Sequence, residues 1–352
     1  MLRRYSSIGV FLLLMTTIIS CNNDFNINGQ FQEKTVVFGL LDFATDTNYL
    51  RIEKTFLQGT TDANLLATDA ENFYYANGEL KVYLEQWTNG SYVTTITADY
   101  VDGDSLGVPK DTGTFAASPN ILYRLVTPID SMSMYKLFIV NTTTGDTITA
   151  STNVVHDFTT YYPTKPGVYI DYSDTNKITY TCKQAVYGKM YDLLMRFHYY
   201  EKNNLTGDSV LKSVDWQIIS NKIGDNIDGS GNISYSIEKQ AFFTFLASAI
   251  DPDENVVRSF SSIDFFWYAG GVELYDQYMN ILANLGINED YISPEYSNIN
   301  GGLGMFSSRH REAIYGVKLY DVTLDSLACG SITRPLHFVS SPANPDYPGC
   351  SF

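Results

Sequence analysis

The chain has few of the side chains that most often bind metals or carry catalysis. Its 352 residues include four histidines, four cysteines and three tryptophans. No HExxH motif and no phosphate-binding loop occurs, and no two cysteines have the CxxC spacing of a zinc site or a thioredoxin-type redox site. The sequence therefore predicts no catalytic residues, no metal site and no cofactor, and it favours a protein that is not an enzyme.

Basic residues are also scarce. There are 23 Lys and Arg residues against 39 Asp and Glu residues, which gives a formal net charge of −16. Such a surface repels a phosphate backbone, so nucleic acid is not an expected partner. Hydrophobic residues still make up 44% of the chain, so we expect folded domains of about 150 residues each rather than disorder.

No apolar run is long enough to span a bilayer comfortably. At the amino terminus, a cationic start precedes a mostly apolar stretch over 8–19, and Ser20-Cys21 follows. A charged start, a short apolar middle and a small residue before the cleavage point are typical of a signal peptide. This stretch and the apolar run over 241–250 are both shorter than the ~20 residues of a membrane span. We therefore predict a signal peptide over 1–20.

The end of this leader contains a recognisable string. Ile18-Ile19-Ser20-Cys21 resembles the lipobox of bacterial lipoproteins, in which the leader is cleaved before the cysteine and the cysteine is then acylated. Two or more acyl chains give stable attachment to a lipid bilayer, so Cys21 is the predicted lipidation site. A polar tether over 21–34 would follow it. The alternative is an ordinary leader with an incidental cysteine.

The body of the chain has the alternation of polar and apolar residues that is typical of β-strands. Two alternating runs over 79–87 and 92–100 flank Asn89-Gly90. This dipeptide is a strong hairpin signal because both residues tolerate a positive φ. Seven or so short strands of this kind predict an immunoglobulin-like β-sandwich over 35–158.

A second all-β domain is expected after a linker. Prolines and a glycine over 161–167 interrupt the strand pattern. Strand-like runs then resume, among them 233–245. Over 272–285 apolar residues recur every three or four positions, which predicts one amphipathic helix packed on a sheet. We expect a larger β-sandwich or barrel over 167–340 with this helix, and a C-terminal tail over 341–352.

Three cysteines remain after Cys21. An exported protein enters a compartment that permits disulfides. Cys329 and Cys350 lie close together near the end of the sequence and could form a disulfide that pins the tail, which would leave Cys182 as a buried thiol. The spacing does not fix this connectivity.

Several polar features have a structural and a functional interpretation. The 27 tyrosines suit half-exposed sheet faces, and they also suit surfaces that bind sugars or proteins. Turns over 225–229 and 251–254 favour solvated acidic loops over calcium sites, because neither has EF-hand spacing. His198, which has aromatic neighbours in a strand, is expected to be structural rather than a ligand or a base.

Glycines cluster near the end of the chain. The string Gly301-Gly302-Leu303-Gly304 predicts a tight turn into a last strand, at a place where two backbones approach closely. A glycine-lined ligand mouth is the alternative.

These features together resemble a known family. The lipobox, the early strand over 36–42 and the SNINGGLGMF string over 297–306 are similar to those of Bacteroidetes outer-membrane lipoproteins of unknown function, which often accompany TonB-dependent receptors. The resemblance implies export and lipid anchoring to the outer membrane, on its periplasmic face or at the cell surface. It supplies no catalytic residues.

The sequence thus predicts an envelope-anchored lipoprotein that acts as a non-enzymatic accessory. Its expected partners are the lipid bilayer through acylated Cys21, a TonB-dependent receptor or another envelope protein, and a glycan or peptide ligand. Two alternatives stay open, a structural docking component of an envelope complex and a glycan-active hydrolase. A deep mouth lined by aromatic residues would favour ligand binding.

Overall fold

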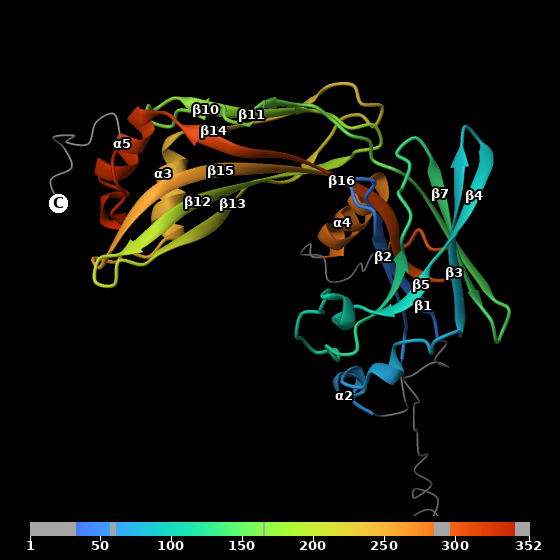
Figure 1. Cartoon of the computed structure of the whole chain (residues 1–352). Coiled ribbons are helices and arrows are strands. Elements are labelled where there is room, and N and C mark those ends of the chain that lie inside the picture. The colour runs from blue at the N-terminus through green and yellow to red at the C-terminus, as the bar shows by residue number, and fades with distance from the viewer. Residues whose placement is uncertain (1–32, 57–60, 165, 285–295, 342–352) are drawn as a thin grey trace, which may run out of the picture. The chain divides into compact units, whose positions relative to one another are not determined.

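The computed structural model describes residues 33–56, 61–164, 166–284 and 296–341. The predicted signal peptide, Cys21 and nearly all of the tether lie outside these ranges, and so does the tail from residue 342 onward. The described residues form mainly strands, which are arranged in three sheets (Figure 1). The predicted all-β fold class is therefore confirmed.

The first part of the chain forms two sheets that enclose one core. Its strands are β1 Thr35–Leu41, β2 Asn48–Lys54, β3 Leu80–Thr88, β4 Ser91–Thr97, β5 Asp99–Asp102, β6 Ile121–Leu125, β7 Met134–Asn141 and β8 Thr147–Asn153. One sheet has the order β4-β3-β7-β8, and the strands β1, β2, β6 and β5 end a larger sheet. Val37, Leu50 and Leu84 are fully buried in this core. This arrangement is a β-sandwich.

The hairpin predicted at Asn89-Gly90 joins β3 to β4. Asn89 has a φ of 51° and Gly90 a φ of 78°, both in the left-handed region that the tight turn requires. The loops of this part contain three short helical segments, which are α2 Ala63–Ala67, η2 Ala70–Asn72 and η3 Asp104–Leu106.

The second part of the chain is built from longer strands around a larger aromatic core. Its strands are β9 Thr160–Tyr162, β10 Tyr169–Ile170, β11 Lys177–Lys183, β12 Met190–Asn203, β13 Ser209–Ile223, β14 Asn232–Glu238, β15 Val256–Gly270 and β16 Leu303–Leu319. The order β13-β12-β15-β16 continues the large sheet, and β14-β11-β9 form a third sheet. Tyr180, Phe265 and Trp267 are fully buried in this core. Because these sheets have free edges, the structure matches the sandwich alternative.

One strand, β16, belongs to both cores. Its first residues pair in parallel with β1, with Gly304 opposite Val37, and its later residues pair antiparallel with β15. Phe306 packs in the first core, whereas Ile314 and Val317 pack in the second. The last long strand is therefore needed to complete the sandwich that the first strands begin.

The glycine string before β16 makes the close backbone approach that its sequence predicts. Gly301 has a φ of 85° in the turn, and Gly304 has a φ of 102°. A Cβ atom on Gly304 would lie 2.1 Å from the carbonyl oxygen of Val37. No side chain fits between the two backbones at this point, which is a packing role for the glycine.

The structure contains more helices than the sequence predicts. The amphipathic helix expected over 272–285 is present as α4 Val272–Asn284. The run expected to be a strand over 233–245 is instead β14 followed by α3 Gln240–Ala249, and α5 Asp321–Cys329 with η4 Arg334–Leu336 follows β16. α3 buries Phe242, Phe243 and Leu246 on one face. A short continuous apolar run of this kind does not distinguish a helix from a strand by periodicity, which explains the error.

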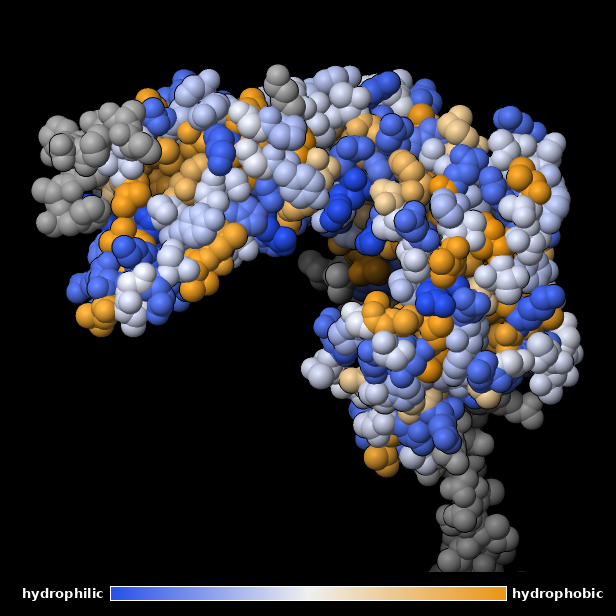
Figure 2. All heavy atoms as spheres, viewed as in Figure 1, coloured by the Kyte–Doolittle hydropathy of each residue, from blue (hydrophilic) through white to orange (hydrophobic). Residues whose placement is uncertain are grey.

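The surface mixes polar residues with exposed apolar ones. On the face shown in Figure 2, small apolar groups are separated by hydrophilic residues. Among the described helices, none combines the length and the apolar character that crossing a membrane requires.

Candidate functional site

The first core carries a cavity whose wall is rich in tyrosine. This tyrosine cavity has a volume of about 380 Å³, within the range of small-molecule sites. It is bounded by the end of β2, by η2, by the segment before β3, by β5 and by the start of β6. The residues that give it its chemistry are Lys54, Glu71, Tyr74, Tyr75, Glu79 and Tyr100.

Hydrogen bonds hold the three rings in place. The Tyr75 hydroxyl bonds with Thr35 Oγ1 at 2.7 Å, and the Tyr74 hydroxyl accepts a bond from Arg51 Nη1 at 3.0 Å. The Tyr100 hydroxyl donates to the Tyr75 carbonyl oxygen at 3.4 Å. Burial raises the pKa of Tyr74 and Tyr100, so both rings keep neutral hydroxyl groups at physiological pH.

Charged side chains stand at the same wall. Lys54 Nζ lies 5.6 Å from the centre of the Tyr75 ring, a cation–π distance. Glu79 accepts a hydrogen bond from the Ala76 backbone N–H at 2.9 Å. Neither Lys54 nor Glu71 has a side-chain ion pair with another residue that the structure describes. The cavity therefore offers an ammonium and a carboxylate that the fold itself does not neutralise.

A buried hydroxyl lies behind this wall. Tyr123 is 2% exposed, and its hydroxyl has no hydrogen-bond partner within the described residues. Burial raises its pKa well above the ordinary value, and nearby Tyr100, Glu79 and Tyr75 raise it further. These three neighbours all line the tyrosine cavity. A buried hydroxyl without a partner is energetically costly, and this one lies close to residues of the cavity wall.

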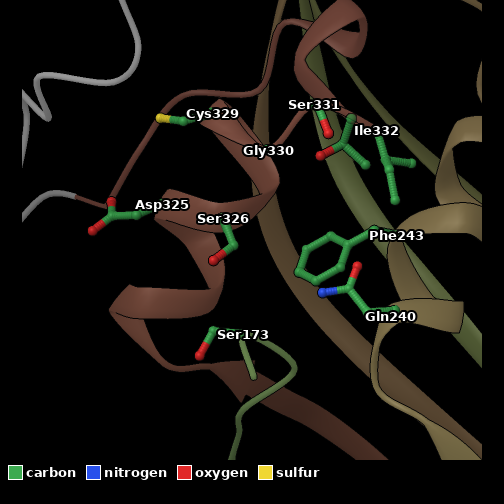
Figure 3. A pocket seen from close by; sticks show the side chains of 10 residues that line it. Ser173, Gln240, Phe243, Asp325, Ser326, Cys329, Gly330, Ser331 and Ile332 are labelled. Atoms are coloured by element: carbon green, nitrogen blue, oxygen red, sulfur yellow. The ribbon is translucent and has the colours of Figure 1, made fainter. Parts of the chain in front are cut away.

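The second core carries a cavity of different composition. This α5 cavity has a volume of about 370 Å³ and lies where α3, α5 and the turn after α5 meet (Figure 3). Figure 3 shows Phe243 and Gln240 reaching from α3 toward Ser326 of α5, while Asp325 and Cys329 point away from them. Uncharged polar groups and one aromatic ring therefore face the cavity.

A buried histidine with two carboxylates beside it lies outside both cavities, on β16 between the two cores. His310 Nε2 lies 2.9 Å from Glu312 Oε1, and its Nδ1 lies 3.8 Å from Asp42 Oδ1, which is an ion-pair distance rather than a hydrogen bond. Phe43 stacks on its ring, with 4.3 Å between the ring centres. Burial alone would lower the pKa of His310, but the two carboxylates outweigh burial and raise it to about 9. This imidazole is thus a structural cation.

A half-buried acid lies close by. Glu273 of α4 accepts hydrogen bonds from Ser307 Oγ at 2.8 Å and from Thr152 Oγ1 at 3.1 Å. Burial raises the pKa of Glu273, although these hydrogen bonds partly oppose the shift. Its contacts tie α4 to β8 and β16, which is a structural role.

One serine has the spacing of a hydrolase motif. The segment Gly103–Gly107 has the sequence GDSLG, a match to the G-x-S-x-G pattern of nucleophilic serines. Ser105 lies in η3, in an exposed loop, and its hydroxyl donates to the Asp102 carbonyl oxygen at 2.7 Å. The motif requires a strand, a sharp turn and a following helix, with a base beside the serine. The loop here has only a single helical turn, so the match lacks that context.

The residues singled out in the sequence have separate positions. Cys21 lies outside the described residues, and so does Cys350. Cys329 is disulfide-bonded. Because Cys350 lies outside the described residues, the pairing of these two cysteines stays a prediction. Cys182 is a buried free thiol whose pKa is raised by burial.

His198 Nε2 bonds with Asp264 Oδ2 at 2.9 Å between neighbouring strands, which fits the predicted structural role.

The acidic turns hold their own loops together. Asp228 accepts a hydrogen bond from the Ser230 backbone N–H, and Asp253 accepts one from the Asn255 backbone N–H, each at 2.8 Å. No group of three or more metal-ligating side chains is brought together in the described ranges. The sequence did not predict the residues of either cavity. Its abundance of tyrosine is the one signal that pointed toward a surface like the tyrosine cavity.

Comparison with known proteins gives distant structural likeness only. No protein-family model matches the chain, and no curated protein matches its sequence. Among solved structures, the chain is similar to the C-terminal globular domain of an oligosaccharyltransferase from Pyrococcus abyssi, at 12% sequence identity and a TM-score of 0.22. The similarity covers 51% of this chain and 35% of that one. So distant a likeness assigns no function.

Proposed function

We propose that this protein is an exported lipoprotein, attached to the outer membrane through acylated Cys21, that binds a small polar ligand as an accessory to a TonB-dependent uptake system. The observation that carries the binding role is the tyrosine cavity. Its rings supply apolar faces, while Lys54 and Glu71 supply charges that no ion pair of the described fold uses. Small-molecule sites combine these two features.

The buried polar groups support binding over catalysis. A general base must be able to take a proton near neutral pH and must reach its substrate. His310 has a pKa of about 9 and a side chain that is 5% exposed, so it is already protonated and enclosed. Hydrolysis of a glycan by the protein stays a rival function, and the release of reducing ends from oligosaccharides would reveal it.

The docking alternative has one observation in its favour. Strand β13 is an edge of the large sheet, and Val210 and Leu211 on it are 56% and 52% exposed. An exposed edge strand can pair with a strand of another protein. If an envelope protein co-purifies with this protein to the same extent with and without ligand, the docking alternative is favoured over the ligand-binding role.

The anchoring is tested by replacing the predicted lipidation site. In cells fed an alkyne-labelled fatty acid, the wild-type protein should carry label, begin at Cys21 by mass spectrometry and fractionate with outer membranes. Cys21→Ala should lose both label and membrane attachment, because no acyl chains remain to be buried. Cys182→Ala is the matched control and should keep both. An unmodified wild-type amino terminus that retains the leader would refute the anchoring.

The partner is tested with the lipidated protein in native membranes. A tagged wild-type protein should co-purify with a TonB-dependent receptor after mild cross-linking, whereas Cys21→Ala should not. Protease treatment of intact cells then distinguishes attachment at the cell surface from attachment facing the periplasm. Recovery of the same receptor with Cys21→Ala would show that anchoring does not bring the two together.

A further inference from the structure

We propose that the α5 cavity is a binding site for a neutral saccharide. The proposal goes beyond the tyrosine cavity and does not depend on it, because the two cavities belong to different cores. Its basis is the juxtaposition of Phe243, Gln240, Ser326 and Ser331 around an open volume of about 370 Å³ (Figure 3).

The first argument is charge. None of the described side chains that line the cavity is basic, and its one acid is Asp325. Figure 3 shows Asp325 pointing away from Phe243, and its Oδ1 accepts a hydrogen bond from the Ser341 backbone N–H at 3.0 Å. Phosphates and carboxylates need a cation or several aligned N–H groups, and bound cations need carboxylate oxygens. The wall thus favours an uncharged ligand.

The second argument is the hydrogen-bonding capacity of the wall. Ser326 and Thr333 donate their hydroxyl protons to the carbonyl oxygens of Val322 and Leu327 at 2.7 Å and 2.6 Å. Their oxygens can still accept a bond from a ligand. The side chains of Gln240 and Ser331 make no hydrogen bond within the described part of the chain, so the Gln240 amide has two donors and an acceptor to offer.

The third argument is the apolar face. Phe243 is 4% exposed and is fixed by packing in the second core, so its ring forms a rigid part of the cavity wall. Ile332 on the turn after α5 is 40% exposed and adds apolar surface at the rim. The limited apolar surface of Phe243 and Ile332 beside scattered donors and acceptors matches a pyranose ring, which has a C–H face and hydroxyls that both donate and accept. A fatty acyl chain would leave the polar groups unpaired.

The assignment is tested with full-length protein purified in detergent. Maltotriose, cellotriose, xylotriose and mannotriose are titrated by calorimetry, and hydrogen exchange locates the protected peptides. At least one trisaccharide should bind with an affinity that does not change between low and high salt, because no charge is involved. Protection should fall on α3 and on residues 326–333.

Matched tryptophan variants distinguish the cavity from the surface around it. Ser331→Trp places an indole at the rim and should weaken binding at least about tenfold, since it fills the volume that the sugar would occupy. Ser248→Trp adds the same indole at an exposed position of α3 outside the cavity and should bind like wild type. Gln240→Ala should cause a smaller loss, and unfolding midpoints verify that all three variants fold.

The contrary outcomes are specific. The proposal is overturned if no trisaccharide binds, if protection falls outside the cavity, or if Ser331→Trp and Ser248→Trp bind equally well. It is also overturned if the matching uronic acid trisaccharides bind more tightly and lose affinity with salt. The anchoring experiments with Cys21→Ala do not depend on any of these results, so the two proposals can fail separately.

Discussion

The two cavities differ in the chemistry that their walls present, and the difference follows from the cores that carry them. The tyrosine cavity lies on the first core, among short strands and loop helices, and combines phenol rings with Lys54, Glu71 and Glu79. The α5 cavity lies at the second core, beside two helices, and presents hydroxyls, an amide and Phe243. The two proposals therefore assign ligands of two classes, a charged or polar one to the tyrosine cavity and a neutral one to the α5 cavity.

The two cores are joined by one strand. In β16 the sequence changes from the apolar Phe306 to Ser307 and Ser308, and then to His310, before the apolar residues of the second core begin. These polar residues are buried. Ser307 bonds to Glu273 of α4, Ser308 to the Asn153 carbonyl oxygen of β8, and His310 to Glu312 of β16 itself. Because the first residues of β16 pack in the first core and its later residues in the second, a substitution in this strand should destabilise one core more than the other.

The largest effect is expected from Gly304→Ala. The new Cβ would lie 2.1 Å from the Val37 carbonyl oxygen, at a φ of 102° that side-chain-bearing residues rarely adopt. Separating β1 from β16 should cost at least about 3 kcal/mol of unfolding free energy. Urea denaturation measures the loss, and hydrogen exchange should show it first in β1 and β2 rather than in β12.

Gly316→Ala is the matched control on the same strand. Gly316 has a φ of 69°, but a Cβ there would meet no atom within 4 Å. Only the left-handed backbone is then unfavourable, at about 1 to 2 kcal/mol. Equal losses from the two substitutions would show that backbone conformation, and not the contact with Val37, makes Gly304 necessary.

Local sequence signals predicted much of this fold because the forces involved are local. Asn89-Gly90 specified its hairpin, and the glycines at 301–304 specified a close backbone approach. The partner of Gly304 was not predictable, because pairing between Val37 and a strand more than 260 residues later depends on tertiary contacts. For the same reason, the residues of each cavity come from distant segments and carry no shared motif.

The second effect is a loss of stability at high pH, when buried His310 of β16 loses its proton. The pKa of His310 is raised from 6.5 to about 9 in the folded state. Its contribution to stability is therefore fully present below pH 6.5 and is lost as the pH rises through 9. The change is about 3 kcal/mol, from the linkage between proton binding and folding. Denaturant midpoints measured from pH 6 to pH 10 should fall over this window.

Asp42→Asn sharpens this test. It removes the negative charge that lies 3.8 Å from His310 Nδ1 while keeping a similar shape. The variant should be less stable than wild type at pH 7, and its stability should fall less between pH 7 and pH 10. A wild-type profile that is flat above pH 7 would contradict the assignment of His310 as a buried cation.

The smallest effect is expected from the charges of the tyrosine cavity. Glu71→Gln should change the unfolding free energy by no more than about 0.5 kcal/mol and Lys54→Gln by no more than about 1 kcal/mol, because neither side chain has an ion pair within the described fold and Lys54 loses only its cation–π contact with Tyr75. Urea denaturation again measures this, with Arg258→Gln as the contrast, since buried Arg258 pairs with Glu201 at 2.8 Å and should lose about 3 kcal/mol or more. A large loss from Lys54→Gln would show that the charge supports the fold. A small loss would leave the charge free of a role in stability, as the proposed binding role of the tyrosine cavity requires, and would agree with the partial exposure of Lys54 to solvent.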